Sequence, residues 1–251
     1  MNSPVDVNPS LVVSVISHGH GRMVQALLQE IADVSAGVVT RVVLTINCPE
    51  TFRVGEGEWP FLLELKFNEH PLGFGANHNA ALQGATEDFL CVLNPDVHLL
   101  GADPFAALMQ AAANGGEACS YPTQVDEQGK IQDSERALPT PRALMRRRIL
   151  GQAEACVDWV NAACLMFPRR LWQEIRGFDE SYHMYCEDVD LCIRLRLAGF
   201  QLKKASCTLQ HAGSRASHRQ WNHLRWHVGS LLRLWQSPAY KAYKKTLYGR
   251  T

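Results

Sequence analysis

The chain has 251 residues, of which 46% are hydrophobic and 20% are charged, values typical of one large globular domain or one domain with a small appendage. No apolar run reaches the roughly 18–20 residues of a membrane-spanning helix, and the first ten residues lack the features of a signal peptide. The eight cysteines contain no C-x-x-C pair, so we expect reduced thiols in a cytoplasmic protein, without a disulfide framework or a zinc site.

Apolar runs alternate with helical patterns through the first hundred residues. The runs 11–17, 41–47, 62–67 and 89–93 are typical of buried strands, and helices are expected after residue 21 and over 76–83. This alternation predicts an α/β sheet with crossover helices. Ligands bind such sheets at the carboxyl ends of the strands. Five polar residues fall at these ends: Ser17, His18, Asn47, Asn94 and Asp96.

The pattern changes beyond residue 120. Residues 121–132 predict a hairpin around a turn at 126–129. Residues 138–150 contain two prolines and the run Arg146-Arg147-Arg148, which we interpret as a mobile basic loop. Residues 157–167 are expected to be buried, and a helix is expected from Val189 to a C-cap at Gly199.

The segment 177–191 carries five carboxylates within twelve positions, interleaved with aromatic residues. Carboxylates beside apolar groups are those whose pKa values can be adjusted for proton transfer. Acidic residues also favour a helix N-terminus, because they complement its dipole and cap its free N–H groups. The segment alone leaves both interpretations open.

Three other local patterns are ambiguous by themselves. Asp96 in Asn94-Pro95-Asp96 could bind a divalent cation, although this tripeptide also favours a turn. His211 could be a second metal ligand or a structural histidine. The glycine-rich segment 73–79 suits close approach of the backbone to a ligand, or a tight loop before a capped helix.

The charge distribution is strongly asymmetric. Residues 191–251 contain twelve Lys and Arg and no Asp or Glu, whereas residues 1–190 contain 25 acidic and 13 basic residues. Between 217 and 248, Trp and Tyr alternate with the cations, which favours an anionic membrane surface as partner. A helix that packs on the body with a solvated basic face is an equal alternative. Nucleic acid is not expected, because the rest of the chain is acidic.

The motifs in their order resemble glycosyltransferase family 2, especially its rhamnosyltransferase-like branch. The resemblance covers about residues 11–235. It rests on Asn68-x-x-x-x-Gly73-Phe74-Gly75-x-x-x-Asn79, Asn94-Pro95-Asp96-Val97, Ile131-Gln132-x-Ser134-x-Arg136, Trp159-Val160-Asn161, Gly177-Phe178-Asp179-Glu180, Glu187-Asp188-Val189-Asp190 and His211-Ala212-Gly213.

The resemblance implies a GT-A fold, a Rossmann-like, mostly parallel sheet flanked by helices. We expect a GT-A domain over 1–215, with a nucleotide-sugar half (1–100) and an acceptor half (101–215), followed by the basic extension 216–251. By the same resemblance, the nucleotide-sugar is bound by Ser17, His18, Asn47, Gly73, Gly75, Asn77, Asn79, Asn94 and Asp96.

The resemblance also assigns chemical roles. Asp188 corresponds to the catalytic base, and Glu187, Trp159, Asn161 and Asp190 are expected to support it or the acceptor. Asp96 and His211 would bind a divalent metal, Mg²⁺ or Mn²⁺. The sequence departs from the family pattern at Asn47 and Asn94, where aspartates are usual, and at Ala162-Ala163, where the usual pair is Gly-Ala.

The implied activity is sugar transfer with inversion, from a nucleotide-sugar to a saccharide or lipid-linked acceptor in bacterial cell-surface polysaccharide or lipopolysaccharide synthesis. The resemblance favours L-rhamnose from dTDP-rhamnose, with UDP- or GDP-sugars as alternatives. A catalytically silent scaffold that binds sugar or membrane is the alternative from another class. We expect a cytoplasmic protein, peripheral on the inner face of the plasma membrane.

Overall fold

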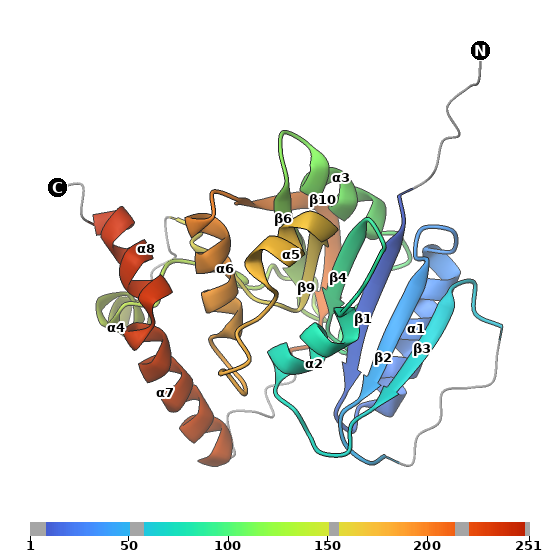
Figure 1. Cartoon of the computed structure of the whole chain (residues 1–251), viewed down its shortest axis with the longest axis horizontal. Helices are drawn as coiled ribbons and strands as arrows, with labels where there is room; N and C mark the ends of the chain where they lie inside the picture. The colour runs from blue at the N-terminus through green and yellow to red at the C-terminus, as the bar shows by residue number, and fades with distance from the viewer. Residues whose placement is uncertain (1–8, 51–57, 151–155, 214–220, 249–251) are drawn as a thin grey trace.

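An eight-stranded sheet forms the centre of the molecule, with the strand order β3-β2-β1-β4-β9-β6-β10-β5 (Figure 1). The computed structural model describes residues 9–50, 58–150, 156–213 and 221–248. The strands of this sheet are β1 (Leu11–Ser17), β2 (Arg41–Ile46), β3 (Leu62–Phe67), β4 (Phe89–Leu93), β5 (Val97–His98), β6 (Ala118–Val125), β9 (Cys164–Pro168) and β10 (Gln201–His211). A separate two-stranded sheet pairs β7 (Glu135–Arg136) with β8 (Trp159–Val160).

Most strands of the large sheet run in the same direction. The pairs β1–β2, β2–β3, β1–β4 and β6–β10 are parallel, whereas β9 runs antiparallel between β4 and β6. Six strands therefore have their carboxyl ends at the same end of the sheet: β1, β2, β3, β4, β6 and β10. The polar residues that follow the strands gather there, as predicted, and we call this end of the sheet the polar edge.

Helices cover both faces of the sheet, so each central strand is buried on both sides. In β1, Val12 joins the core cluster under α2, α5, α6 and α8, whereas Val13 joins the cluster under α1 and α3. This strict alternation follows from the two-residue period of a strand. The helices are α1 (Gly21–Val34), α2 (Phe74–Leu82), α3 (Phe105–Ala113), α4 (Pro141–Leu150), α5 (Arg169–Ile175), α6 (Glu187–Leu197), α7 (Trp221–Gln236) and α8 (Pro238–Tyr248).

The α/β class, the first four predicted strands and the turn at 126–129 are confirmed. The prediction of a mobile loop over 138–150 is wrong, because residues 141–150 form α4. Thr140 caps this helix through a hydrogen bond from the Ala143 N–H to Thr140 Oγ1 (3.0 Å). Pro141 occupies the first helical position, where its fixed φ angle favours a helix.

The basic C-terminal segment forms α7 and α8, and α8 packs against α6 (Figure 1). Leu234, Tyr240 and Tyr243 are buried in the core cluster that includes α6. The Tyr243 hydroxyl donates a hydrogen bond to Asp158 Oδ1 (2.9 Å). The predicted alternative, in which the segment packs on the body, therefore holds for one face of the segment, whereas residues 224–229 of α7 are exposed.

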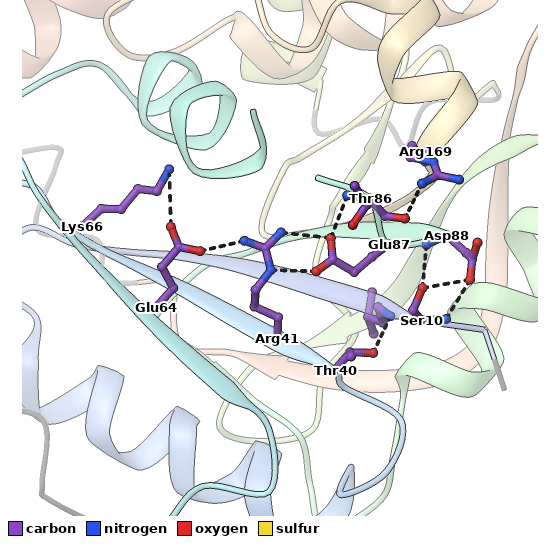
Figure 2. A network of polar contacts seen from close by, with 10 residues as sticks. Ser10, Thr40, Arg41, Glu64, Lys66, Thr86, Glu87, Asp88 and Arg169 are labelled. Atoms are coloured by element: carbon purple, nitrogen blue, oxygen red, sulfur yellow. Dashed lines mark hydrogen bonds and ion pairs between the residues drawn. The ribbon is translucent and has the colours of Figure 1, made fainter. Parts of the chain in front are cut away.

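A network of ion pairs lies at the opposite end of the strands from the polar edge (Figure 2). The Arg41 guanidinium donates to both carboxylate oxygens of Glu87 (2.6 and 2.9 Å) and to Glu64 Oε2 (2.7 Å). Ser10 and Asp88 exchange hydrogen bonds beside this cluster. The network ties β2 and β3 to the segment before β4 and is separate from the candidate site.

Candidate active site

Asp96 and His211, the predicted metal ligands, lie side by side at the polar edge. The chain turns after β4, and β5 then pairs with the end of β10 so that Val97 lies opposite His211. The Ala212 N–H donates to the Asp96 carbonyl oxygen (3.0 Å), which fixes the register. As a result, His211 Nε2 and Asp96 Oδ1 are 3.4 Å apart, although the two residues are distant in sequence.

The donor set of this pair suits a divalent cation. A carboxylate oxygen suits Mg²⁺ and Mn²⁺, and an imidazole nitrogen is a common metal ligand. His211 Nδ1 is buried and has no hydrogen-bond partner among the described residues. Among the residues that the structure describes, no group of three or more His, Cys, Asp or Glu side chains could hold a metal ion. A cation held by this pair would complete its ligand sphere with diphosphate and water oxygens.

Asp188 and Glu187 lie at the N-terminus of α6, in the wall of a cavity of about 210 Å³. Trp159 and Asn161 line the same cavity, so the candidate base and two of its predicted supports are brought together. Glu187 is 7% exposed. Both carboxylates belong to the first turn of α6, so the acidic segment does supply the start of a helix.

Burial controls the charge of this carboxylate pair. It raises the pKa of the Asp188 carboxyl, and the Val189 N–H bonded to Asp188 Oδ1 (2.8 Å) and the positive charge of Arg136 oppose that rise. Burial and the negative charge of Asp188 raise the pKa of Glu187 as well. A carboxylate with a raised pKa is a better proton acceptor for a hydroxyl than an ordinary one.

The backbone before the pair adopts an unusual conformation. Tyr185 and Cys186 have φ angles of +70° and +66°, in the left-handed region that residues with side chains rarely enter. Two such residues in succession turn the chain sharply into α6. Strained backbone of this kind is often retained at functional sites.

The remaining predicted supports have defined partners. Trp159 Nε1 donates to the Ala137 carbonyl (2.9 Å), and the Arg136 guanidinium lies 5.3 Å from the centre of the Trp159 ring. Asn161 exchanges two amide hydrogen bonds with Gln124 (2.6 and 3.1 Å). Asp190 is 2% exposed and pairs with Arg194 (2.7 Å), so its contact is within the protein.

The ion pair with Arg194 gives Asp190 a structural role. Its guanidinium donates to the carbonyls of Ile175 (2.6 Å) and Gly177 (2.8 Å), where α5 ends and the acidic segment begins. Asp190 thus holds the arginine that positions the start of the acidic segment.

Several predicted nucleotide-binding residues form a polar network at the ends of β1, β2 and β3. Asn47 accepts hydrogen bonds from the Leu72 N–H and from Asn68 Nδ2 (both 2.8 Å). Its own Nδ2 lies 3.0 Å from His18 Nδ1. The buried Asn77 donates to the Gly73 carbonyl (2.9 Å). Ser17 is fully buried, and its Oγ accepts from the His20 N–H (3.2 Å).

The glycine-rich segment packs against the acidic segment. A Cβ atom on Gly73 would lie 2.6 Å from the His183 carbonyl oxygen, and one on Gly75 would lie 2.6 Å from Phe178 Cβ. Asn79 is hydrogen-bonded to the backbone of Phe178. These glycines therefore have a packing role, and their contact with a nucleotide stays a prediction.

Two cavity residues come from a part of the chain to which the sequence reasoning gave no role in the site. His227 and Leu231 of α7 line the cavity beside Asp188. Their spacing of four residues is a signal that both lie on one helical face. Arg136 belongs to the family-like motif, but its influence on Asp188 became visible only in the structure.

Sequence comparisons relate the chain to rhamnosyltransferases, although it matches no protein-family model. It is 28% identical to rhamnosyltransferase WbbL of Escherichia coli over 201 residues, which are 71% of this chain and 73% of that protein. It is 33% identical to the N-acetylglucosaminyl-diphospho-decaprenol L-rhamnosyltransferase of Mycobacterium tuberculosis over 133 residues. The second match spans 45% of this chain and less than half (43%) of that relative.

Solved structures share the fold at low sequence identity. A mannosyltransferase from Pyrobaculum calidifontis, solved with GDP-Man and Mn²⁺, has a TM-score of 0.63 at 16% identity, covering 99% of this chain and 79% of that chain. Staphylococcus aureus TarS has a TM-score of 0.54 at 13% identity, covering 96% of this chain and 42% of that chain. The predicted GT-A fold and the predicted resemblance to glycosyltransferases are confirmed.

Proposed function

We propose that this chain, which fits the rhamnosyltransferase-like branch of glycosyltransferase family 2, transfers a sugar from a nucleotide-sugar to a saccharide acceptor with inversion. The process is synthesis of a bacterial cell-surface polysaccharide or lipopolysaccharide. The favoured donor is dTDP-rhamnose, since the two curated relatives described above carry rhamnosyl transfer in their names. The name of the mycobacterial relative favours an acceptor sugar on a polyprenyl diphosphate.

The position of Asp188 is the observation that carries this proposal. Its carboxylate lines a cavity beside Trp159 and Asn161, which can hold an acceptor sugar by its apolar face and its hydroxyls. A sugar hydroxyl is a poor nucleophile, so a positioned base must accept its proton during attack. The raised pKa of Asp188 suits that role.

The donor would lie at the polar edge of the sheet. Asp96 and His211 would hold Mg²⁺ or Mn²⁺, which when bound neutralises charge on the diphosphate leaving group. His18 and the segment 73–79 would contact the nucleotide, and the buried Ser17 and Asn47 would keep the surrounding loops in place through their hydrogen bonds. Asn94 lies at the same edge, where its N–H donates to the Ala163 carbonyl (2.8 Å).

A thermal-shift screen tests the donor and the metal together. dTDP-rhamnose, UDP-sugars and GDP-sugars are each added with and without Mn²⁺. The proposal predicts that dTDP-rhamnose raises the melting temperature most, and more so with Mn²⁺. Asp96→Asn and His211→Ala should remove the additional effect of Mn²⁺. If only GDP- or UDP-sugars stabilise the protein, dTDP-rhamnose is not the donor. If no nucleotide-sugar stabilises it, the proposal is refuted.

The outer face of α7 supports a peripheral contact with the cytoplasmic face of the plasma membrane, where a lipid-linked acceptor would lie. Leu224, Val228 and Leu232 recur every four residues and are 54%, 48% and 49% exposed. No acidic residue occurs from 191 onward, so nothing in that segment repels anionic lipid. None of the described helices is long and apolar enough to cross a bilayer.

Vesicle co-sedimentation tests this contact. The protein should pellet with phosphatidylglycerol-containing vesicles and less so at high salt. Replacing Leu224, Val228 and Leu232 together by serine should weaken the binding, because it removes the apolar stripe and retains every cation. Binding that is insensitive both to salt and to the triple substitution would contradict the membrane contact.

A further inference from the structure

The helix α7 lies directly against the loop that carries the candidate base. Ser230 Oγ donates a hydrogen bond to the Met184 carbonyl (2.8 Å). The ring of Trp226 contacts that of His183 at 5.1 Å between centroids, and the ring of His227 contacts that of Tyr185 at 5.2 Å. Three consecutive loop residues are thus held by one helix.

The position of α7 is fixed from its other end as well. Trp235 Nε1 donates to the Pro139 carbonyl (2.8 Å), and Leu234 is fully buried. In α8, Tyr243 bonds to Asp158, whose other carboxylate oxygen accepts from the Leu138 N–H (2.7 Å). These polar contacts anchor the two helices next to Trp159, so the wall that α7 contributes is a built part of the cavity.

His227 and Leu231 of α7 line the same cavity as Asp188, Trp159 and Asn161. A sugar ring has both apolar faces and hydroxyl groups. A cavity lined by apolar side chains together with an amide, an imidazole and a carboxylate can therefore bind one. A volume of about 210 Å³ is smaller than the roughly 300–1,000 Å³ of ordinary ligand pockets, and it suits one sugar residue.

We infer that α7 completes the acceptor site, and that His227 and Leu231 contact the acceptor sugar whose hydroxyl faces Asp188. This inference rests on the proposed glycosyltransferase function and adds the C-terminal helix to the acceptor-binding part of the enzyme. His227 donates or accepts a hydrogen bond to the sugar, and Leu231 packs on its apolar face. The step itself is unchanged: the acceptor oxygen bonds to the sugar carbon, the nucleoside diphosphate leaves, and Asp188 takes the proton.

Steady-state kinetics on the full chain test the inference. The probe acceptor is N-acetylglucosamine on a short-chain polyprenyl diphosphate, used without vesicles and with dTDP-rhamnose as donor. His227→Ala and Leu231→Ala should each raise the KM for the acceptor about tenfold, the loss expected for one contact with the ligand. The KM for the donor should not change, and kcat should stay within about threefold, because the lost contact is uniform binding.

Two variants serve as controls. Leu247→Ala makes the same change as Leu231→Ala on an exposed side chain of α8 (41% exposed) and should leave the acceptor KM unchanged. His227→Gln keeps a hydrogen-bonding group and should recover part of the affinity. Melting temperatures of all variants identify any that fold poorly, and His227 is exposed enough that His227→Ala should melt normally.

The outcomes separate this inference from the proposed function. An unchanged acceptor KM in His227→Ala and Leu231→Ala, or an equal rise in Leu247→Ala, overturns the role of α7. A fall in kcat without a rise in acceptor KM also overturns it, since that would indicate a disturbed base. A wild-type protein that binds the donor but not the probe overturns the acceptor class, whereas one that binds no nucleotide-sugar refutes the proposed function.

Discussion

Asn79 of α2 and Phe178 of the acidic segment are joined by two hydrogen bonds, although 99 residues separate them in sequence. Asn79 Nδ2 donates to the Phe178 carbonyl (2.9 Å), and the Phe178 N–H donates to Asn79 Oδ1 (2.9 Å). The side-chain amide thus pairs with the backbone as a neighbouring strand would. This pairing connects the glycine-rich segment, expected at the donor, to the segment that carries the candidate base.

Asn79→Ala should destabilise the protein by about 2 kcal/mol, because both Phe178 backbone groups lose their partner. Chemical denaturation measures this loss. Asn114→Ala, at an exposed position after α3, is the matched control and should change stability little. Equal stability of the two variants would show that the pairing contributes nothing.

Gly75→Ala and Gly229→Ala should have opposite effects on stability. The added methyl at 75 would lie 2.6 Å from Phe178 Cβ, so the acidic segment must shift, at a cost of about 1–3 kcal/mol. The helical Gly229 has open space around it, and alanine there should stabilise by roughly 0.5–1 kcal/mol. Melting temperatures that move in the same direction for both variants would contradict this packing.

The pH dependence of transfer should report Asp188. The base must be deprotonated, so kcat/KM should fall as the pH drops through the pKa of Asp188, which burial raises above its ordinary value. Arg136→Gln removes a positive charge that lowers this pKa, and should move the acidic limb to higher pH. Arg136→Lys keeps the charge and should move it less. Profiles that coincide for all three proteins would exclude this electrostatic coupling.

Glu87 should make the stability of the fold depend on pH. Its hydrogen bonds from Arg41 lower its pKa in the folded state, against the opposing effect of burial (Figure 2). The ion pair therefore stabilises the fold at pH values above the unfolded pKa, and this contribution is lost as the pH falls through the folded pKa.

Unfolding midpoints at pH 7 and pH 3 test this dependence. Glu87→Gln should be clearly less stable than the wild type at pH 7, with a smaller difference at pH 3. Glu117→Gln, which breaks only a loose pair with the exposed Arg170 (3.9 Å), should change the midpoint little at either pH. A deficit of Glu87→Gln that does not shrink in acid would contradict the assigned role of the pair.

The sequence predicted those parts of the fold in which local pattern and burial agree. The strand β1 is apolar on both faces because it lies between two helical layers, and the same holds for β4. The prediction of a loop was wrong at α4, because the prolines and arginines of residues 138–150 were interpreted as signs of a loop and not of a short capped helix. There the cap at Thr140 and the proline at the first helical position were local signals that could have been used.

Residues of the candidate site could be predicted from the sequence only where they belong to a recognisable motif. Asp96, His211 and Asp188 were identified from the family resemblance, and the structure brings Asp96 and His211 together through the pairing of β5 with β10. The contribution of His227 could not be predicted, because it depends on how α7 packs against the acidic segment. No pattern within residues 216–251 encodes that long-range contact.

Asp188→Asn tests the central claim most directly, since it removes the base and keeps the size of the side chain. Transfer from dTDP-rhamnose should fall by about 10²–10⁴-fold, the usual contribution of a general base. The melting temperature and the binding of the donor, measured by calorimetry, should stay close to those of the wild type. Turnover by Asp188→Asn at a near-normal rate would contradict the account.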